Sequence, residues 1–503
     1  MEDKTELTAA RVATGSIYLV LQNVFSNLIG ILGFAFMARR ITQAEMGAIA
    51  GFNLLASLVQ FISDFGLNSS IAKHVSESRG KGQDFSEIVT SAVSFRAVIC
   101  LVPAAILFAM APNISVTVFG TDTYTFTIRL LSLDAVILSI SPLLNGILLG
   151  IGRLKEIAIF GIASVSVIWL SVTAFLLADK GTDGIVLGWI IGDGALLIML
   201  ALVVARFAEF RKRLSNSAKQ IPSLLKFAFP LYLASAVSFL HAWYDKAIVL
   251  AYLPLSDLAV YNTASMAFSV LVTIATALGS ALIPYYGMAH GRNDQRAIRL
   301  GIKRVSKYTI LAMFPLTLGL MATSKPTLAL FAGQQYETGW AVLATLSIFG
   351  LTYGITPALS NLLLIYGKTK TILVLSLTST ILSLTLLPLI GILGLEGLAI
   401  IRGASLALSL ALTAYFINKT VKVQIDKGAL AKALTASATM ATIILILEQI
   451  SYNKYLLPLY VLIGATIYIT LIRTLKVLNQ EDFQFLKQTI GERAAKYIMR
   501  ILT

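Results

Sequence analysis

Cysteine, histidine and charged side chains are all scarce in this chain. One cysteine, Cys100, stands among 503 residues, which excludes disulfide bonds within the chain and cysteine zinc sites. The three histidines, His74, His241 and His290, are far apart in the sequence and lack the spacing of metal ligands. Glycine-rich phosphate loops, His-Glu-x-x-His and Gly-x-Ser-x-Gly are missing as well. We therefore expect no catalytic residues, no metal site and no cofactor.

Long apolar runs take the place of charge. Charged residues make up 13 % of the chain and hydrophobic residues 57 %, with a mean hydropathy of +0.82, whereas soluble domains carry about 25 % charged residues. The apolar runs are long enough to cross a hydrocarbon core of about 30 Å as helices. The sequence predicts an all-α, polytopic membrane protein with about 14 transmembrane helices, at residues 14–37, 47–65, 88–111, 126–150, 155–177, 184–205, 223–252, 257–284, 305–323, 339–366, 370–393, 395–417, 429–449 and 453–473.

The basic residues are distributed unevenly over the joints between these spans. With the N-terminus inside, the odd-numbered joints hold few of the 40 lysines and arginines, and this is the asymmetry of the positive-inside rule. Both termini are therefore expected in the cytoplasm, with the chain in the cytoplasmic membrane. The net charge of +15 then sets topology and meets anionic membrane lipids, and it does not indicate nucleic acid as a partner. The tail, residues 478–503, is typical of an amphipathic helix on the inner surface.

One phrase of the sequence occurs twice. "SPLLNGILLGIGRLK" at residues 141–155 aligns without a gap with "TPALSNLLLIYGKTK" at residues 356–370. Further echoes predict that the first six spans and the next six are copies, and because six is even the repeat is parallel. Transporters bind substrate where such halves meet. The expected domains are an N-terminal six-helix lobe (1–213), a C-terminal six-helix lobe (214–425), transmembrane helices 13 and 14 (426–477) and the tail (478–503).

Each copy of this phrase carries a proline within a span and ends on a glycine followed by a basic residue. The prolines are Pro142 and Pro357, and the glycines are Gly152 and Gly367. Proline removes a backbone hydrogen bond, which a membrane helix tolerates where neighbours satisfy the freed backbone. The sequence leaves two interpretations open, a fixed kink or a hinge.

Polar side chains recur at helical spacing in several spans. Asn53, Ser57, Gln60 and Asp64 follow one another at steps of three and four in span two, which places them on one helix face. Small polar residues also occur at ordinary helix–helix contacts, but Asn, Gln and Asp favour a hydrated cleft between spans one, two, seven and eight. The candidate substrate-binding residues are Asn23, Asn27, Asn53, Gln60, Asp64, Asp245, Lys246, Asn262, Ser269 and Thr273.

Charged residues within spans are functional hypotheses of their own, because each costs about 2.5–3.5 kcal/mol near a helix centre on insertion scales. Asp245 and Lys246 lie in the outer half of span seven and point about 100° apart on a helix, so they do not simply neutralise one another. Arg96 and Arg402 are expected to extend toward the membrane surface. For Asp193, which has a glycine on each side, a buried hydrogen bond and a coupling role both stay open. The secondary charged candidates are Arg39, Arg40, Arg96, Asp134, Asp193 and Arg402.

Two segments resemble a known family. "DKAIVLAYLPLSDLAVYNTASMAFSVLVTIATALGSALIPYYGMAHGR", residues 245–292, is similar to the span 7–8 signature of polysaccharide-export flippases, and "ITQAEMGAIAGFNLLASLVQFISDFGLNSSIAKHVSESRGKGQ", residues 41–83, is similar to its first-lobe counterpart. The family belongs to the multidrug/oligosaccharidyl-lipid/polysaccharide exporter superfamily. The resemblance implies a flippase that carries a lipid-linked oligosaccharide, with its polyisoprenyl phosphate or diphosphate, to the outer leaflet by alternating access for glycan assembly. Asp245 is the one site residue that the resemblance itself supports.

The polar residues suit such a substrate. Amide and hydroxyl groups of the stripes can bind sugar hydroxyls, and Lys246, Arg96 and the pair Arg39–Arg40 are candidate donors to a phosphate, while the isoprenoid tail stays in lipid. The partners implied are the lipid-linked oligosaccharide, membrane lipids and a glycan polymerase or glycosyltransferase.

Three other functions are weighed against this one. A cation-coupled multidrug exporter of the same superfamily is expected to have a more apolar, aromatic cleft, whereas spans two and eight are rich in Asn, Ser and Thr. A membrane glycosyltransferase or glycan polymerase needs a large outer loop with acid–base residues, and the predicted outer joints are short. A pure scaffold has no need of charges within its spans.

Overall fold

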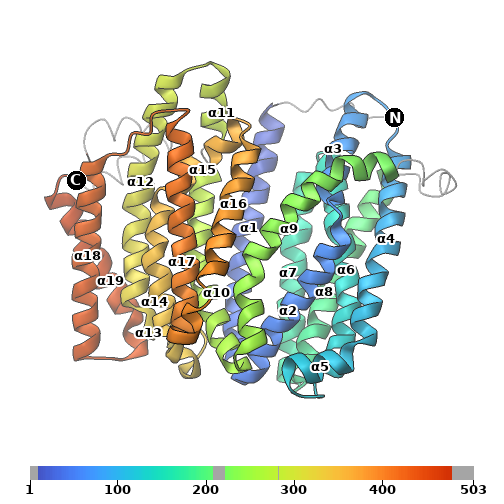
Figure 1. Ribbon diagram of the computed structural model, residues 1–503, viewed down its shortest axis with the longest axis horizontal. Coiled ribbons are helices and arrows are strands. Elements are labelled where there is room, and N and C mark those ends of the chain that lie inside the picture. Colours follow the sequence, from blue (N-terminus) through green and yellow to red (C-terminus); the bar gives the residue numbers. More distant parts are fainter. Residues whose placement is uncertain (1–8, 208–220, 281–282, 479–503) are drawn as a thin grey trace. The chain divides into compact units, whose positions relative to one another are not determined.

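The computed structural model describes residues 9–207, 221–280 and 283–478, and in these ranges every regular element is a helix (Figure 1). The all-α class predicted from the sequence is confirmed. The predicted amphipathic tail lies outside the described residues beyond position 478. Contacts between helices divide the chain into two compact units, Met1–Ala259 (unit 1) and Val260–Thr503 (unit 2).

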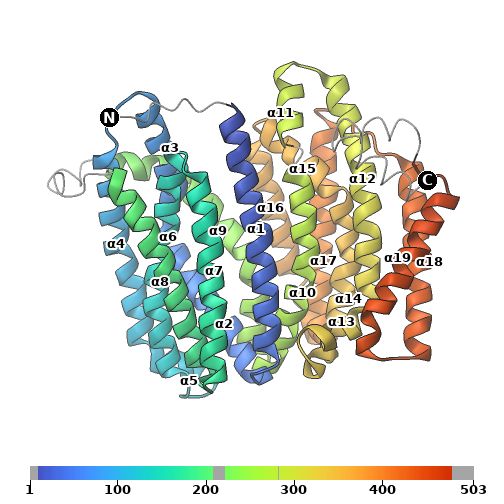
Figure 2. The same cartoon turned by 180° about the vertical axis from the view of Figure 1, so that it is seen from behind.

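Unit 1 is a bundle of long helices with two short ones. Its helices α4, α6, α7 and α8 run side by side (Figures 1 and 2). The elements are α1 Ala9–Ala38, α2 Gln43–Asp64, α3 Leu67–Gly80, α4 Ser86–Ala109, α5 Ala111–Phe119, α6 Thr125–Gly150, α7 Leu154–Leu177, α8 Gly181–Phe207, α9 Ile221–Tyr252 and the start of α10 Leu255–Ser280.

Unit 2 contains the rest of α10 and a series of helices that is more often interrupted. α12 packs against α18, and α18 packs against α19, which lies beside it in both views (Figures 1 and 2). The elements are α11 Ile283–Gly291, α12 Gln295–Ala322, α13 Ser324–Phe331, η3 Gln334–Gly339, α14 Trp340–Phe349, η4 Gly350–Gly354, α15 Thr356–Ile365, α16 Thr369–Thr385, α17 Leu389–Asn418, α18 Lys427–Ile450, η5 Lys454–Leu456 and α19 Leu457–Thr474.

The protein is a multi-pass membrane protein. Among the described residues, 12 helices are long and apolar enough to cross a membrane, or 13 if the bent pair Gln334–Gly354 and Thr356–Ile365 counts as one span. This pair falls on the tenth predicted span, and the shorter apolar helix Lys370–Thr385 falls on the eleventh. The predicted count of about 14 spans stays a prediction, as do the domain boundaries drawn from the repeat.

The order of elements in the first half of the chain recurs in the second. α5 and α13 are both short helices that directly follow a long apolar one, and the repeated phrase closes α6 and α15 with the same cap. Gly152 has φ 76° and Gly367 has φ 63°, the left-handed backbone that glycine adopts without strain. The N–H of the next residue reaches back to the helix in both copies, Arg153 to the Leu148 carbonyl (2.9 Å) and Lys368 to the Leu363 carbonyl (2.8 Å).

The break between α2 and α3 shapes one side of unit 1. α2 begins with a capping box, in which the Glu45 carboxylate accepts from the Thr42 N–H at 2.8 Å. It ends at Phe65 and Gly66, which both have positive φ, 46° and 71°. A Cβ on Gly66 would lie 2.3 Å from the carbonyl oxygen of Ala228. Glycine is therefore required here both by its backbone conformation and by the close approach of α9.

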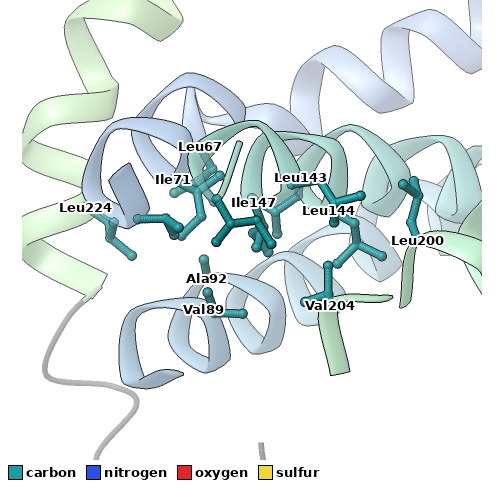
Figure 3. Packing of buried hydrophobic residues seen from close by; sticks show 13 residues of the cluster. Leu67, Ile71, Val89, Ala92, Leu143, Leu144, Ile147, Leu200, Val204 and Leu224 are labelled. Atoms are coloured by element: carbon teal, nitrogen blue, oxygen red, sulfur yellow. The ribbon is translucent and has the colours of Figure 1, made fainter. Parts of the chain in front are cut away.

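A cluster of buried hydrophobic residues joins α3, α4, α6, α8 and α9 at the same end of unit 1 (Figure 3). Two glycines let α6 approach α3, because a Cβ on Gly146 would meet the Asn68 carbonyl at 2.6 Å and one on Gly150 the Ala72 carbonyl at 2.8 Å. The cluster consists of Leu67, Ile71, Val75, Val89, Ala92, Leu143, Leu144, Ile147, Leu148, Ile151, Leu200, Val204 and Leu224.

Candidate functional site

The four polar residues on one face of α2 have different surroundings. Asn53 is exposed, and its amide donates to the Ile49 carbonyl of its own helix at 3.1 Å. Ser57 is half-buried, Gln60 reaches α6 and Asp64 reaches α4. The face therefore combines one exposed amide with side chains that hold neighbouring helices.

Gln60 completes the backbone of α6 at its proline. Pro142 lies inside α6 and has no N–H, so the carbonyl of Leu138, four residues earlier, lacks its usual helical donor. The Gln60 Nε2 donates to that carbonyl at 2.9 Å. α6 continues as one helix through Pro142. In this half of the chain, the proline is accommodated by a polar neighbour, and the amide nitrogen of Gln60 is engaged in doing so.

In unit 2, a side chain from another helix also donates to the carbonyl that a proline leaves without its helical donor. Pro315 lies inside α12, and the carbonyl four residues earlier belongs to Leu311. The hydroxyl of Tyr468, on α19, donates to that carbonyl at 2.8 Å. Two polar side chains within hydrophobic helices are thus explained by prolines on their neighbours.

Pro357, the counterpart of Pro142 in the repeat, lies at a break. It starts α15 after the 3₁₀ turn η4, and the two arms of this broken span are bent by 53°. Val272 occupies the position of α10 that the repeat aligns with Gln60, and it has no side-chain donor. Asn361 instead joins α15 to α10 by donating to the Gly279 carbonyl at 2.7 Å. The two copies of the phrase therefore differ, with a continuous helix in one half and a broken one in the other.

Arg96 is fully buried where α4 meets the break between α2 and α3. Its Nη1 donates to the Ser63 carbonyl (2.7 Å), and its Nη2 donates to the Asp64 carboxylate (2.8 Å) and to the Asn68 Oδ1 (2.9 Å). Its side chain is 0 % exposed, so the expectation that it extends to the membrane surface is wrong. The guanidinium instead caps the carbonyl end of α2, because the last carbonyls of a helix have no donor of their own.

Aromatic rings fix α9 against the same break. The Tyr232 ring stacks on Phe61 (5.1 Å between centroids) and on Phe65 (5.3 Å), and Phe239 stacks on Phe61 at 4.7 Å. Phe61 and Phe65 come from α2 and its C-cap. Spans two and seven are therefore in contact within unit 1.

Asp245 and Lys246 lie near the C-terminal end of α9 in different environments. Asp245 is buried (1 % exposed), and its Oδ1 accepts the backbone N–H of Lys246 at 2.8 Å. Lys246 is half-buried, with its ammonium 4.8 Å from the centre of the Trp243 ring. An ammonium over an aromatic face is attracted by the ring electrons, and this contact holds the Lys246 side chain against Trp243.

The remaining candidates lie on α1, α10 and α17 and in the joint after α1. Asn23 and Asn27 are exposed on α1, which packs against α7 through Gly33 and Trp169. On α10, the Ser269 and Thr273 hydroxyls donate to carbonyls of their own helix, at 2.6 and 3.0 Å. Asn262 is half-buried on α10, and Arg402 is half-buried on α17. Arg39 and Arg40 are exposed after α1, with the Arg40 guanidinium over the Phe36 ring at 5.4 Å. Their assignment to one substrate cleft stays a prediction.

Asp134 and Asp193 lie on the adjacent helices α6 and α8. Asp134 is 0 % exposed, and neither of its carboxylate oxygens has a hydrogen-bond partner. Asp193 is half-buried and interacts electrostatically with Asp134. Among the described residues there is no group of three or more His, Cys, Asp or Glu that could hold a metal ion.

Sequence reasoning missed the side chains that join these helices. Asn68 completes the Arg96 site and follows Asp64 by four residues in "SDFGLN", a spacing that a continuous helix would place on one face. Tyr468 could have been found by asking which carbonyl Pro315 leaves without a donor, but the sequence does not say which helix supplies that donor.

The comparisons with known proteins agree on the class of fold and on a family. The profile of the family described as "Polysaccharide biosynthesis protein" matches residues 36–340. The chain is 22 % identical over 494 residues to a Haloferax volcanii protein named "Probable low-salt glycan biosynthesis flippase Agl15", and the match covers 98 % of this chain and 99 % of that protein.

Two solved structures show the same fold. The structure titled "Lipid II flippase MurJ, inward closed conformation" superposes with a TM-score of 0.72 at 16 % identity, over 95 % of this chain and all of that one. An inward-facing multidrug resistance transporter of the MATE family superposes with a TM-score of 0.60 at 15 % identity, over 81 % of this chain and 94 % of that one. These similarities confirm the resemblance found in the sequence and the transporter fold.

Proposed function

The chain belongs to the polysaccharide biosynthesis protein family, and on that basis we propose that it is a flippase for a lipid-linked glycan. The observation that carries the proposal is the match to a glycan biosynthesis flippase along nearly the whole of both chains. The fold shared with a lipid II flippase supports it.

The substrate we propose is an oligosaccharide on a polyisoprenyl phosphate or diphosphate. It moves from the cytoplasmic to the outer leaflet of the cell membrane by alternating access, with both termini of the chain in the cytoplasm. Exposed amides such as Asn23, Asn27 and Asn53 suit sugar hydroxyls, and Lys246 suits the phosphate. Arg96 is less suited to it, because its guanidinium already binds Ser63, Asp64 and Asn68. A glycan polymerase or glycosyltransferase would use the translocated product.

A cation-coupled multidrug exporter is the second candidate. The specific observation in its favour is the superposition on multidrug transporters, which has a lower TM-score and covers less of this chain than that on the lipid II flippase. The two candidates differ in what accumulates when the protein is missing, a lipid-linked glycan or a drug.

Deletion of the gene tests the proposal in cells. We expect lipid-linked oligosaccharide to accumulate in the cytoplasmic leaflet, the mature surface glycan to fall, and plasmid-borne wild-type protein to restore both. A second plasmid, with the exposed Asp122 replaced by asparagine, serves as a matched control for expression. Normal glycan in the deletion strain, together with greater drug sensitivity, would reject the flippase in favour of the exporter.

A further inference from the structure

Asp134 is a carboxylic acid held inside unit 1 without a partner. It lies about two and a half turns into α6, and Asp193 lies about three and a third turns into α8, and both helices start from the same side of the unit (Figure 1). Asp134 is 0 % exposed, and both of its oxygens lack a hydrogen-bond donor. Asp193 interacts with it electrostatically from the neighbouring helix.

This environment disfavours the ionised form of Asp134. A carboxylate that loses water without gaining donors or a counter-ion is so unfavourable that the group takes up a proton instead. A second carboxylate nearby adds to this, because two like charges in one site do not both ionise.

Among the described residues of the helices packed against α6, no cation forms a hydrogen bond with Asp134. Arg96 on α4 is bound to Asp64, and Arg129, on α6 itself, is exposed with its guanidinium over the Phe108 ring. The titratable and charged groups on the helices packed against α6 are Glu45, Asp64, Lys73, His74, Glu77, Arg79, Glu87, Arg96, Cys100, Lys155, Glu156, Asp183, Asp193 and Arg206. Among them, Asp193 is the group that interacts electrostatically with Asp134.

The other half of the chain shows that packing does not require these carboxylates. The repeat aligns Asp134 with Phe349 on α14 and Asp193 with Leu406 on α17. There the two helices meet through an apolar contact, since a Cβ on Gly403 would lie 1.9 Å from the Phe349 ring. The pair of acids is confined to unit 1.

We propose that Asp134 and Asp193 form a proton-binding site in unit 1. In this conformation Asp134 carries the proton as a neutral carboxylic acid. When the conformation changes and water reaches the pair, the O–H bond breaks, the proton leaves on water and a carboxylate remains. Coupling of this cycle to glycan movement rests on the proposed function, whereas the binding of the proton does not.

Proton occupancy is measured first, without any glycan. Infrared spectra of the purified chain in lipid vesicles at neutral pH should contain the C=O stretch of a buried carboxylic acid. This band should be lost in Asp134→Asn and retained in Asp122→Asn, which changes an exposed acid of the joint before α6. A band that is missing from the wild type, or unchanged by Asp134→Asn, would overturn the site.

A second readout needs no substitution. Dicyclohexylcarbodiimide is apolar and reacts with protonated carboxyl groups, so it should add to Asp134 or Asp193 of the wild-type chain, as located by mass spectrometry of peptides. Absence of the adduct from both residues contradicts the proposal even if Asp134→Asn fails to fold.

Coupling is tested last, in vesicles that contain a polyprenyl diphosphate oligosaccharide. An imposed pH gradient should change the rate of glycan movement in the wild type and not in Asp134→Asn. If wild-type vesicles move no glycan, the proposed function fails while the infrared result stands. If a sodium gradient replaces the pH gradient in full, or if Asp134→Asn keeps its response to pH, the pair is not the coupling proton site.

Discussion

At the scale of single residues, the position of Arg96 is explained by what its neighbours lack. Arg96 supplies donors to the carbonyl end of α2, where the chain turns through two positive φ values. The sequence marks Arg96 as a charge within a span, but it does not reveal that the Ser63 carbonyl, the Asp64 carboxylate and the Asn68 amide converge on it. These groups converge because the chain breaks between α2 and α3, and the glycine of "DFG" (residues 64–66) is the sequence feature that indicates this break.

Replacement of Arg96 tests this role. Arg96→Ala leaves the Asp64 carboxylate without its ion pair and the Ser63 carbonyl without a donor. Breaking a buried pair from one side costs about 3–5 kcal/mol, so thermal unfolding in detergent should occur at a clearly lower temperature. Arg129→Ala, which removes an exposed guanidinium from a phenylalanine ring, should have little effect. Equal stability of Arg96→Ala and wild type would show that the cluster is not structural.

At the scale of elements, the prolines decide which helices bend. Both copies of the repeated phrase carry a proline, but Pro142 lies inside α6 and Pro357 lies at the start of α15. What the sequence could not predict is that α6 stays continuous while its counterpart breaks, because that depends on a donor from another helix. Gln60 is such a donor and Val272 is not.

A double-mutant cycle tests the link between Gln60 and Pro142. Gln60→Leu leaves the Leu138 carbonyl unsatisfied, at a cost of about 1–3 kcal/mol. Pro142→Ala restores a backbone N–H to that carbonyl, so Gln60→Leu should cost much less in the Pro142→Ala background. The free energies come from unfolding in detergent, and Tyr468→Phe with Pro315→Ala repeats the cycle in unit 2. A penalty of the same size in both backgrounds would mean that Gln60 does not complete α6.

At the scale of the whole molecule, composition and the long apolar runs were sufficient for the class, because hydropathy reports membrane helices directly. The all-α architecture, the multi-pass class and the family were all predicted. The candidate site was harder to predict, since helical spacing places residues on a face but does not say which neighbour that face meets. Gln60 and Asp64 share such a face, yet they bind two different helices.

Orientation in the membrane is the first whole-molecule prediction. In a Cys100→Ala background, a cysteine at exposed Thr117 on α5 should react with an impermeant thiol reagent added to intact cells. A cysteine at exposed Glu77 on α3 should react only after permeabilisation. The physical reason is the basic character of the even-numbered joints, and the reverse pattern would invert the predicted topology.

Movement of a lipid-linked glycan by the purified protein directly tests the proposal that the protein is a flippase. The protein is reconstituted into vesicles that contain a polyprenyl diphosphate oligosaccharide, and a glycosidase added outside reports the fraction of glycan in the outer leaflet. Vesicles with wild-type protein should expose nearly all of the glycan to the enzyme, while empty vesicles should expose about half and keep the rest protected. Protection of the same half in vesicles that contain correctly folded protein would contradict the account.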